Sequence, residues 1–321
     1  MIFQNHVLFD KNDCYSLRGV CMILIMCHHL YPNLMDLYPF HFPLDAILVD
    51  IGYLASGTFL FLSGYGLHKS LDKNEITKKY VISHIKKLIL PFLFIFLIDM
   101  FRNIISGTFN ITFTALNLVT LTFTNAGTLW FFKIIFCLYI ILFILHKYIS
   151  SAIARTIILW TITCSFVVIA INTDLQPCWW NSLLCFPLGY TISQYFIANK
   201  TVSVRYAILM GGVFVTCWII MYLFHISPMT GLLFYFFKIL IAMLFSIAAI
   251  SIISKINITT KAGNFVGKNS LCFYLFHVFT LGLGFHIVWW QLVLLIFGIT
   301  VALTFTYNTV EHLKDKLFDG N

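Results

Sequence analysis

The chain has 321 residues, of which 60% are hydrophobic and only 10% are charged, and its mean hydropathy is +0.92. Soluble domains carry about 25% charged residues, so these values exclude a soluble protein and predict an integral membrane protein. The formal net charge of +8 comes from lysines and arginines scattered among loops rather than gathered in one patch, which favours a topology signal over nucleic-acid binding.

Apolar runs long enough to cross a bilayer recur along the chain, since a spanning helix needs about 20 apolar residues. We predict an all-α, multi-pass transmembrane bundle that forms a single domain, 1–321, with a cytoplasmic N-terminal segment at 1–16 and a cytoplasmic tail at 309–321. No small-residue cleavage site follows the first apolar run, so no signal peptide is expected. The ten predicted spans are 17–34, 46–67, 87–106, 128–147, 152–172, 179–197, 204–225, 230–253, 269–286 and 287–308. The first, sixth and ninth are the least apolar, as expected of helices packed inside a bundle.

Alternate loops hold nearly all the basic residues, which predicts that both termini are cytoplasmic. The residues on that side are Lys11, Arg18, Lys69, Lys73, Lys78, Lys79, Lys86, Lys87, Lys147, Arg155, Lys200, Arg205, Lys255, Lys261, Lys268, Lys314 and Lys316. The opposite loops are short except for 107–127, whose apolar middle part, 115–123, is too short to cross. We expect that part to be re-entrant or interfacial.

The first predicted span contains an arginine and two histidines. Eleven helical steps of about 100° separate Arg18 from His29 and bring their side chains onto one face, about 16 Å apart along the axis. Ionisable groups at this depth are costly and predict a functional site. In the alternative interpretation, His29 only hydrogen-bonds a neighbouring helix. That alternative is favoured for His28, which lies about 100° from the shared face.

The second predicted span ends at the level of Arg18. There Gly64, which follows Ser63, either allows close helix packing or brings the backbone near a ligand. A basic stretch follows, with His68, Lys69, His84, Lys86 and Lys87, and ends at Pro91. Such a stretch is usually a topology signal, and next to Arg18 it could also bind the phosphates of a cytoplasmic donor.

Together these segments resemble the acyltransferase-3 family of integral membrane O-acyltransferases. The resemblance rests on Arg18-x10-His29, Phe61-Leu62-Ser63-Gly64-Tyr65, the basic stretch up to Pro91, Leu129-Trp130-Phe131-Phe132, and Gly267-x2-Ser270-x3-Tyr274-Leu275-x-His277. In this order the segments span Tyr15 to about Glu311. The chain departs from the family pattern at Tyr15-Ser16, where the family often has Asp-Gly, at Thr128, where it often has His, and after Glu311, where a basic residue and Pro often follow.

The resemblance implies transfer of an acetyl group from cytoplasmic acetyl-CoA to a hydroxyl of a cell-surface polysaccharide or its lipid-linked precursor, in a bacterial plasma membrane. A neutral His29 would act as general base, or as a transient acyl carrier, and Arg18 would bind a CoA phosphate or orient the thioester. The other expected donor contacts are Ser63, Gly64, Tyr65, Lys86 and Lys87. Trp130, Tyr274 and His277 are expected near the acceptor glycan, with interfacial anchoring or core packing as alternatives. We expect membrane lipids as further partners, and no metal ion or nucleic acid.

Four more ionisable residues, Asp50, Asp99, Lys133 and Lys238, lie in apolar segments. We expect them to pair with one another or to line an outward-facing acceptor cavity. The nine cysteines form no C-x-x-C pair, which argues against a metal site or disulfide framework. Cys178 lacks a basic neighbour in sequence and is not expected to be a nucleophile.

Two other functions were weighed. A multi-pass transporter or flippase would use Arg18 and His29 as a relay, but no paired halves with broken helices are found. A glycan polymerase would need basic residues in a large outer loop, and 107–127 has none.

Overall fold

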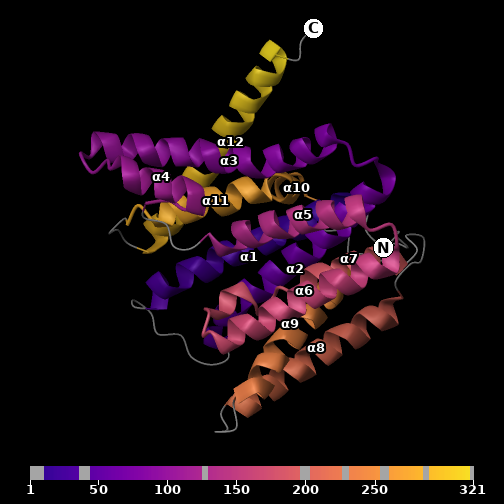
Figure 1. Cartoon of the computed structure of the whole chain (residues 1–321). Coiled ribbons are helices and arrows are strands. Elements are labelled where there is room, and N and C mark those ends of the chain that lie inside the picture. Colours follow the sequence, from indigo (N-terminus) through magenta and orange to yellow (C-terminus); the bar gives the residue numbers. More distant parts are fainter. Residues whose placement is uncertain are drawn as a thin grey trace. The chain divides into compact units, whose positions relative to one another are not determined.

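The computed structural model describes residues 11–35, 44–124, 129–195, 203–225, 231–253, 260–284 and 289–318. Every regular element in these ranges is a helix (Figure 1), so the all-α prediction is confirmed. The helices are α1 (Lys11–Met35), α2 (Leu44–Lys73), α3 (Lys78–Ile105), α4 (Ile111–Thr120), α5 (Trp130–Tyr148), α6 (Ala152–Asn172), η1 (Pro177–Trp179), α7 (Cys185–Tyr195), α8 (Val204–His225), α9 (Gly231–Ile253), α10 (Lys261–Lys268), α11 (Ser270–Leu281) and α12 (Trp289–Phe318).

Within the described ranges, seven helices are long and apolar enough to cross a membrane, namely α2, α3, α5, α6, α8, α9 and α12. Each coincides with a predicted span, and α6 matches its predicted bounds of 152–172. Many of their apolar side chains are exposed, as expected of surfaces that face lipid. The multi-pass membrane protein predicted from the composition is therefore supported.

The three spans predicted to be least apolar are the three that fall outside this set. The first is a 25-residue helix, α1, about 37 Å long at 1.5 Å per residue. The sixth is shorter than predicted, because the chain turns through residues 180–184 and α7 begins only at Cys185, with Pro187 in its first turn. The ninth ends at Leu281, just before Gly284, whose φ of +65° is unsuited to a helix.

The second predicted span also needs correction, because α2 continues from residue 67 to Lys73. His68, expected in a loop, is therefore on a helix and buried, like Leu67 and Leu71 on either side of it. The apolar residues Leu67 and Leu71 keep the helical spacing of four, and this spacing extends the buried face past the end of the apolar run.

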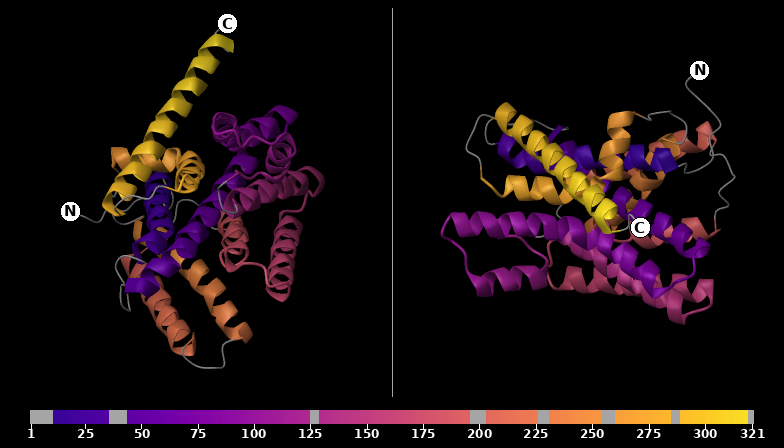
Figure 2. Two further views of the ribbon diagram at one scale, coloured as in Figure 1. Left: turned by 90° about the vertical axis from the view of Figure 1, so that its left-hand side faces the viewer. Right: turned by 90° about the horizontal axis from the view of Figure 1, so that it is seen from above.

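The chain divides into two compact units, which we describe separately. Unit 1 contains Met1–His29, Phe40–Thr77 and Ile134–Lys268, and unit 2 contains Leu30–Pro39, Lys78–Lys133 and Asn269–Asn321. In unit 1, α2 packs closely against α7 and also against α9, and α8 and α9 lie side by side (Figure 1 and Figure 2). In unit 2, α11 packs between α3 and α12. The core of unit 2 includes Phe92, whose ring stacks on those of Phe123 and Phe132 at 5.4 Å each.

Loop 107–127 contains the short helix α4, which begins before the predicted piece at 115–123. Asn110 caps it, with Oδ1 accepting from the Phe113 amide at 3.0 Å. At ten residues α4 is about 15 Å long, so it cannot cross a bilayer alone. Large apolar residues such as Ile111 and Val119 are exposed on it, which suits an interfacial helix.

Candidate functional site

Glycines hold the first half of α1 against α10 within unit 1. Gly19 lies directly against the Gly263 carbonyl, and Gly267 lies against the Tyr15 carbonyl, so neither position has room for a side chain. The Ser16 hydroxyl adds a hydrogen bond to Asn264 Oδ1 at 2.8 Å. Small residues allow such close approach between helices in membranes. These contacts fix the part of α1 that carries Arg18.

Arg18 is half-buried and only weakly bonded. Its Nη2 donates to the Leu62 carbonyl of α2 at 3.4 Å, and its buried Nε has no hydrogen-bond partner among the residues that the structure describes. Beside Nη2 lies Gly66, where an added Cβ would be 3.8 Å away. Among the described residues no carboxylate pairs with Arg18. The guanidinium is thus a cation inside the unit without a compensating anion.

α1 carries both histidines of the motif, and they differ in their surroundings. His28 Nδ1 donates to the Leu48 carbonyl at 3.0 Å, and its ring lies directly against Gly52 of α2. A carbonyl only accepts, so this bond places the proton on Nδ1. His28 therefore has a packing role, as the sequence indicated. His29 is half-buried, with its ring centroid 5.4 Å from that of His28.

The segment Ser63-Gly64-Tyr65 lies on α2, close to the Leu62 carbonyl that binds Arg18. Gly64 faces α7, where the Phe186 carbonyl occupies the place of a side chain, and Gly189 of α7 lies in turn against the Phe61 carbonyl. Close helix packing thus accounts for Gly64. Ser63 and Tyr65 are buried. Lys86 and Lys87 are exposed on the third turn of α3, in unit 2.

The residues expected near the acceptor form a row of rings within unit 2. The Trp130 ring is 5.6 Å from that of Phe131, Phe131 is 5.2 Å from Tyr274, and Tyr274 is 5.8 Å from His277. His277 is fully buried, and its Nδ1 donates to the Phe273 carbonyl of its own helix at 2.8 Å. This geometry favours core packing for His277. An acceptor role for Trp130 and Tyr274 stays a prediction.

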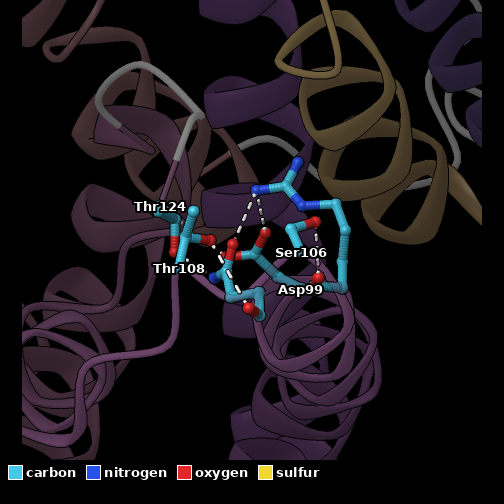
Figure 3. Close-up of polar contacts among 6 residues, drawn as sticks. Asp99, Ser106, Thr108 and Thr124 are labelled. Carbon is cyan, nitrogen blue, oxygen red and sulfur yellow. Dashed lines mark hydrogen bonds and ion pairs between the residues drawn. The ribbon is translucent and has the colours of Figure 1, made fainter.

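No two of the four ionisable residues in apolar segments form a direct ion pair within the described ranges, although Asp50 lies close enough to act electrostatically on Lys238. Asp99 instead pairs with Arg102, one turn along α3, at 2.8 Å, and accepts from the Thr124 amide at 2.9 Å (Figure 3). Asn103, beside Arg102, donates to the Thr124 hydroxyl at 2.8 Å. The pairing of Asp99 with Arg102, one turn away on the same helix, was not predicted. These contacts fasten the end of loop 107–127 to α3.

A family model described as an acyltransferase domain, Acyl_transf_3, matches residues 16–308. The chain belongs to the acyltransferase-3 family. The match includes both the Arg18–His29 helix and the α10–α11 segment, and it confirms the predicted membrane acyltransferase in general terms. No curated protein and no solved structure matches the chain.

Sequence analysis missed a polar cluster of this acyltransferase, on α2, α5 and α7. His68 Nδ1 and the Ser193 hydroxyl are 2.9 Å apart, as are His146 Nε2 and the Tyr190 hydroxyl. The Tyr190 ring also packs edge-on to His68 at 4.8 Å. The cluster satisfies polar groups of three helices and links their ends. Its residues are up to 125 positions apart, and only the helical spacing around His68 pointed to burial.

An acyltransferase can use a cysteine as acyl carrier, and Cys178 lies in η1. Burial raises the pKa of the Cys178 thiol, so less of it is thiolate at neutral pH. Its surroundings therefore agree with the prediction that Cys178 is not a nucleophile.

Proposed function

We propose that this acyltransferase transfers an acetyl group from cytoplasmic acetyl-CoA to a hydroxyl of a surface polysaccharide, or of its lipid-linked precursor, in a bacterial plasma membrane. The family membership supports acyl transfer, and the long apolar helices support a membrane setting. The acetyl donor, the glycan acceptor and the type of membrane belong to the proposal.

The observation that carries the proposal is the uncompensated charge of Arg18. A guanidinium stays protonated, and burying it without an anion is unfavourable. Arg18 has one long hydrogen bond to a carbonyl and an unpartnered Nε, whereas Arg102 is paired with Asp99. An anionic ligand would satisfy Arg18. The phosphates of CoA carry oxygens that a planar guanidinium can bind through two parallel hydrogen bonds.

His29 lies three turns further along α1 and is the proposed general base. An alcohol is a weak nucleophile at neutral pH, so a positioned imidazole speeds its attack by about 10²–10⁴-fold. The hydroxyl oxygen attacks the thioester carbonyl carbon while His29 takes the hydroxyl proton. The C–S bond then breaks, and the proton passes to the leaving thiolate. In the other version His29 itself accepts the acetyl group from the thioester and passes it to the hydroxyl.

Further donor contacts are proposed for Ser63 and Tyr65, which share the end of α2 near the Arg18 contact, and for Lys86 and Lys87. The two lysines are exposed and positively charged, which suits phosphate binding. Gly64 serves this arrangement by letting α2 and α7 approach closely.

Incorporation of labelled acetyl tests the proposal directly. Isolated membranes containing the protein receive acetyl-CoA labelled in the acetyl group, and ester-linked label is measured in the glycan after mild alkali release. We expect alkali-labile label that depends on the protein. Membranes that move glycan across the bilayer but incorporate no label would favour the transporter alternative and contradict acyl transfer.

A further inference from the structure

A second polar site lies in unit 1, between α2, α8 and α9. Asp50 of α2 is buried, and its Oδ2 accepts hydrogen bonds from Trp218 Nε1 at 3.0 Å and from the Tyr222 hydroxyl at 2.8 Å. The Trp218 and Tyr222 rings are themselves 4.8 Å apart. Both bonds fall on one carboxylate oxygen, which leaves Oδ1 for another donor. We call this group, together with Tyr53 and Lys238, the Asp50 site.

The Tyr53 hydroxyl is an unsatisfied polar group of this site, and the Lys238 ammonium lies beside it. The Tyr53 side chain is only 7% exposed, yet its buried hydroxyl has no hydrogen-bond partner in the described part of the chain. The Lys238 ammonium lies over the Tyr53 ring at 5.4 Å and over the Phe234 ring at 5.2 Å. Within the described ranges it forms no direct ion pair, and Asp50 acts on its charge from a longer distance. Buried polar groups are nearly always paired, so the Tyr53 hydroxyl calls for an explanation.

Two more unpaired atoms lie one helical turn away. Asn181 Oδ1 and the Ser182 hydroxyl are both buried and find no partner in the segments that the structure describes. The Ser182 Cβ is 3.4 Å from where a side chain at Gly57 of α2 would begin, and the Ala242 Cβ of α9 is 3.5 Å from the same point. Tyr53 lies one turn before Gly57 on α2, and Lys238 lies one turn before Ala242 on α9. The unpaired groups therefore follow the seam between α2 and α9.

We propose that the Asp50 site binds a sugar unit of the acceptor, an inference that rests on the proposed glycan acylation. A sugar presents hydroxyls that both donate and accept, and it has an apolar face. Its hydroxyls can donate to Asp50 and accept from Tyr53 and Lys238, while Trp218 and Tyr222 offer ring surfaces for its C–H groups. By the predicted orientation these helix ends face outwards. A role limited to joining α2 and α8 accounts for the two bonds to Asp50 but leaves the Tyr53 hydroxyl unexplained.

Tyr53→Phe is the discriminating variant because it removes a hydroxyl that bonds to none of the residues that the structure describes. The probe is the surface polysaccharide of the producing cells, stripped of esters by mild alkali and cut into oligosaccharides. We expect the acceptor KM to rise about fivefold or more, with the donor KM and the thermal unfolding midpoint unchanged. Tyr206→Phe, at an exposed tyrosine of α8, is the matched control and should leave the acceptor KM at the wild-type value.

A binding measurement without donor distinguishes a failure of this inference from a failure of the proposed function. Calorimetric titration of the same oligosaccharides into the protein in nanodiscs, without donor, should give a Kd that Tyr53→Phe raises by a similar factor. A wild-type protein that binds the oligosaccharides but never acylates them would refute the proposed function alone. A Tyr53→Phe protein with the wild-type Kd and acceptor KM would overturn the assignment of the Asp50 site.

Discussion

Two arginines in the membrane helices illustrate how the partners of a side chain distinguish binding from structure. Arg102 is neutralised by Asp99 one turn away, and together they hold loop 107–127 in place. Within the described ranges Arg18 bonds only to the Leu62 carbonyl, at 3.4 Å, although its helix is fixed by glycine contacts on either side. A charge that the protein positions but does not compensate is suited to an anionic ligand.

Replacing Arg18 should therefore weaken donor binding more than it changes the fold. We expect Arg18→Gln to raise the KM for acetyl-CoA by about 10–100-fold, because a charge-assisted hydrogen bond is lost. Arg18→Lys should recover part of the loss, since it keeps the charge but not the planar fork. Initial rates at varied donor concentration measure this. The control is Lys73→Gln, at an exposed lysine that ends α2, which should have the wild-type donor KM. An unchanged donor KM in Arg18→Gln would exclude Arg18 from the donor site.

Glycines set the distances between helices in unit 1. Gly64 and Gly189 let α2 and α7 meet backbone to backbone, and Gly19 and Gly267 do the same for α1 and α10. Gly64 and Gly267 belong to the segments that carry the family resemblance, so these segments serve helix packing in part. The position of Arg18 on α1 therefore depends on the close packing of α1 against α10.

The α2–α7 crossing can be tested with one added methyl group. Gly64→Ala places a Cβ against the Phe186 carbonyl, and we expect it to destabilise the protein by about 1–3 kcal/mol. Thermal unfolding in detergent measures the change. Gly212→Ala on α8 is the matched control, because nothing lies within 4 Å of its added Cβ. Equal midpoints for the two variants would contradict the close crossing.

At the scale of the whole molecule, the orientation in the membrane follows from the basic loops. Ser150, between α5 and α6, should face the cytoplasm, and Asp174, after α6, should face outwards; both are exposed. In a background without native cysteines, Ser150→Cys should resist a membrane-impermeant thiol reagent added to intact cells, while Asp174→Cys should react. The opposite pattern would invert the topology and place Arg18 on the outer side.

Local patterns in the sequence predicted more than long-range contacts did. Apolar runs predicted the long helices because lipid imposes length and hydropathy on each span, and the 11-residue spacing placed Arg18 and His29 on one helix. The predicted span 179–197 was longer than helix α7, because the turns before Pro187 depend on packing against α2. Asp50 and Lys238 were expected to pair or to line an acceptor cavity, but the bonds from Trp218 and Tyr222 to Asp50 were not predicted, since about 170 positions separate these residues and only the fold brings them together.

The most direct test is the ester content of the surface glycan in cells whose only copy of the protein carries His29→Ala. Removing the general base should reduce transfer by at least about 10²-fold, so the O-acetyl signals in NMR spectra of the purified glycan should disappear while the protein stays in the membrane. His28→Ala, which alters a packing contact, should retain measurable esters at matched protein levels. Wild-type ester levels in the His29→Ala cells would contradict the assignment of His29 as the catalytic residue.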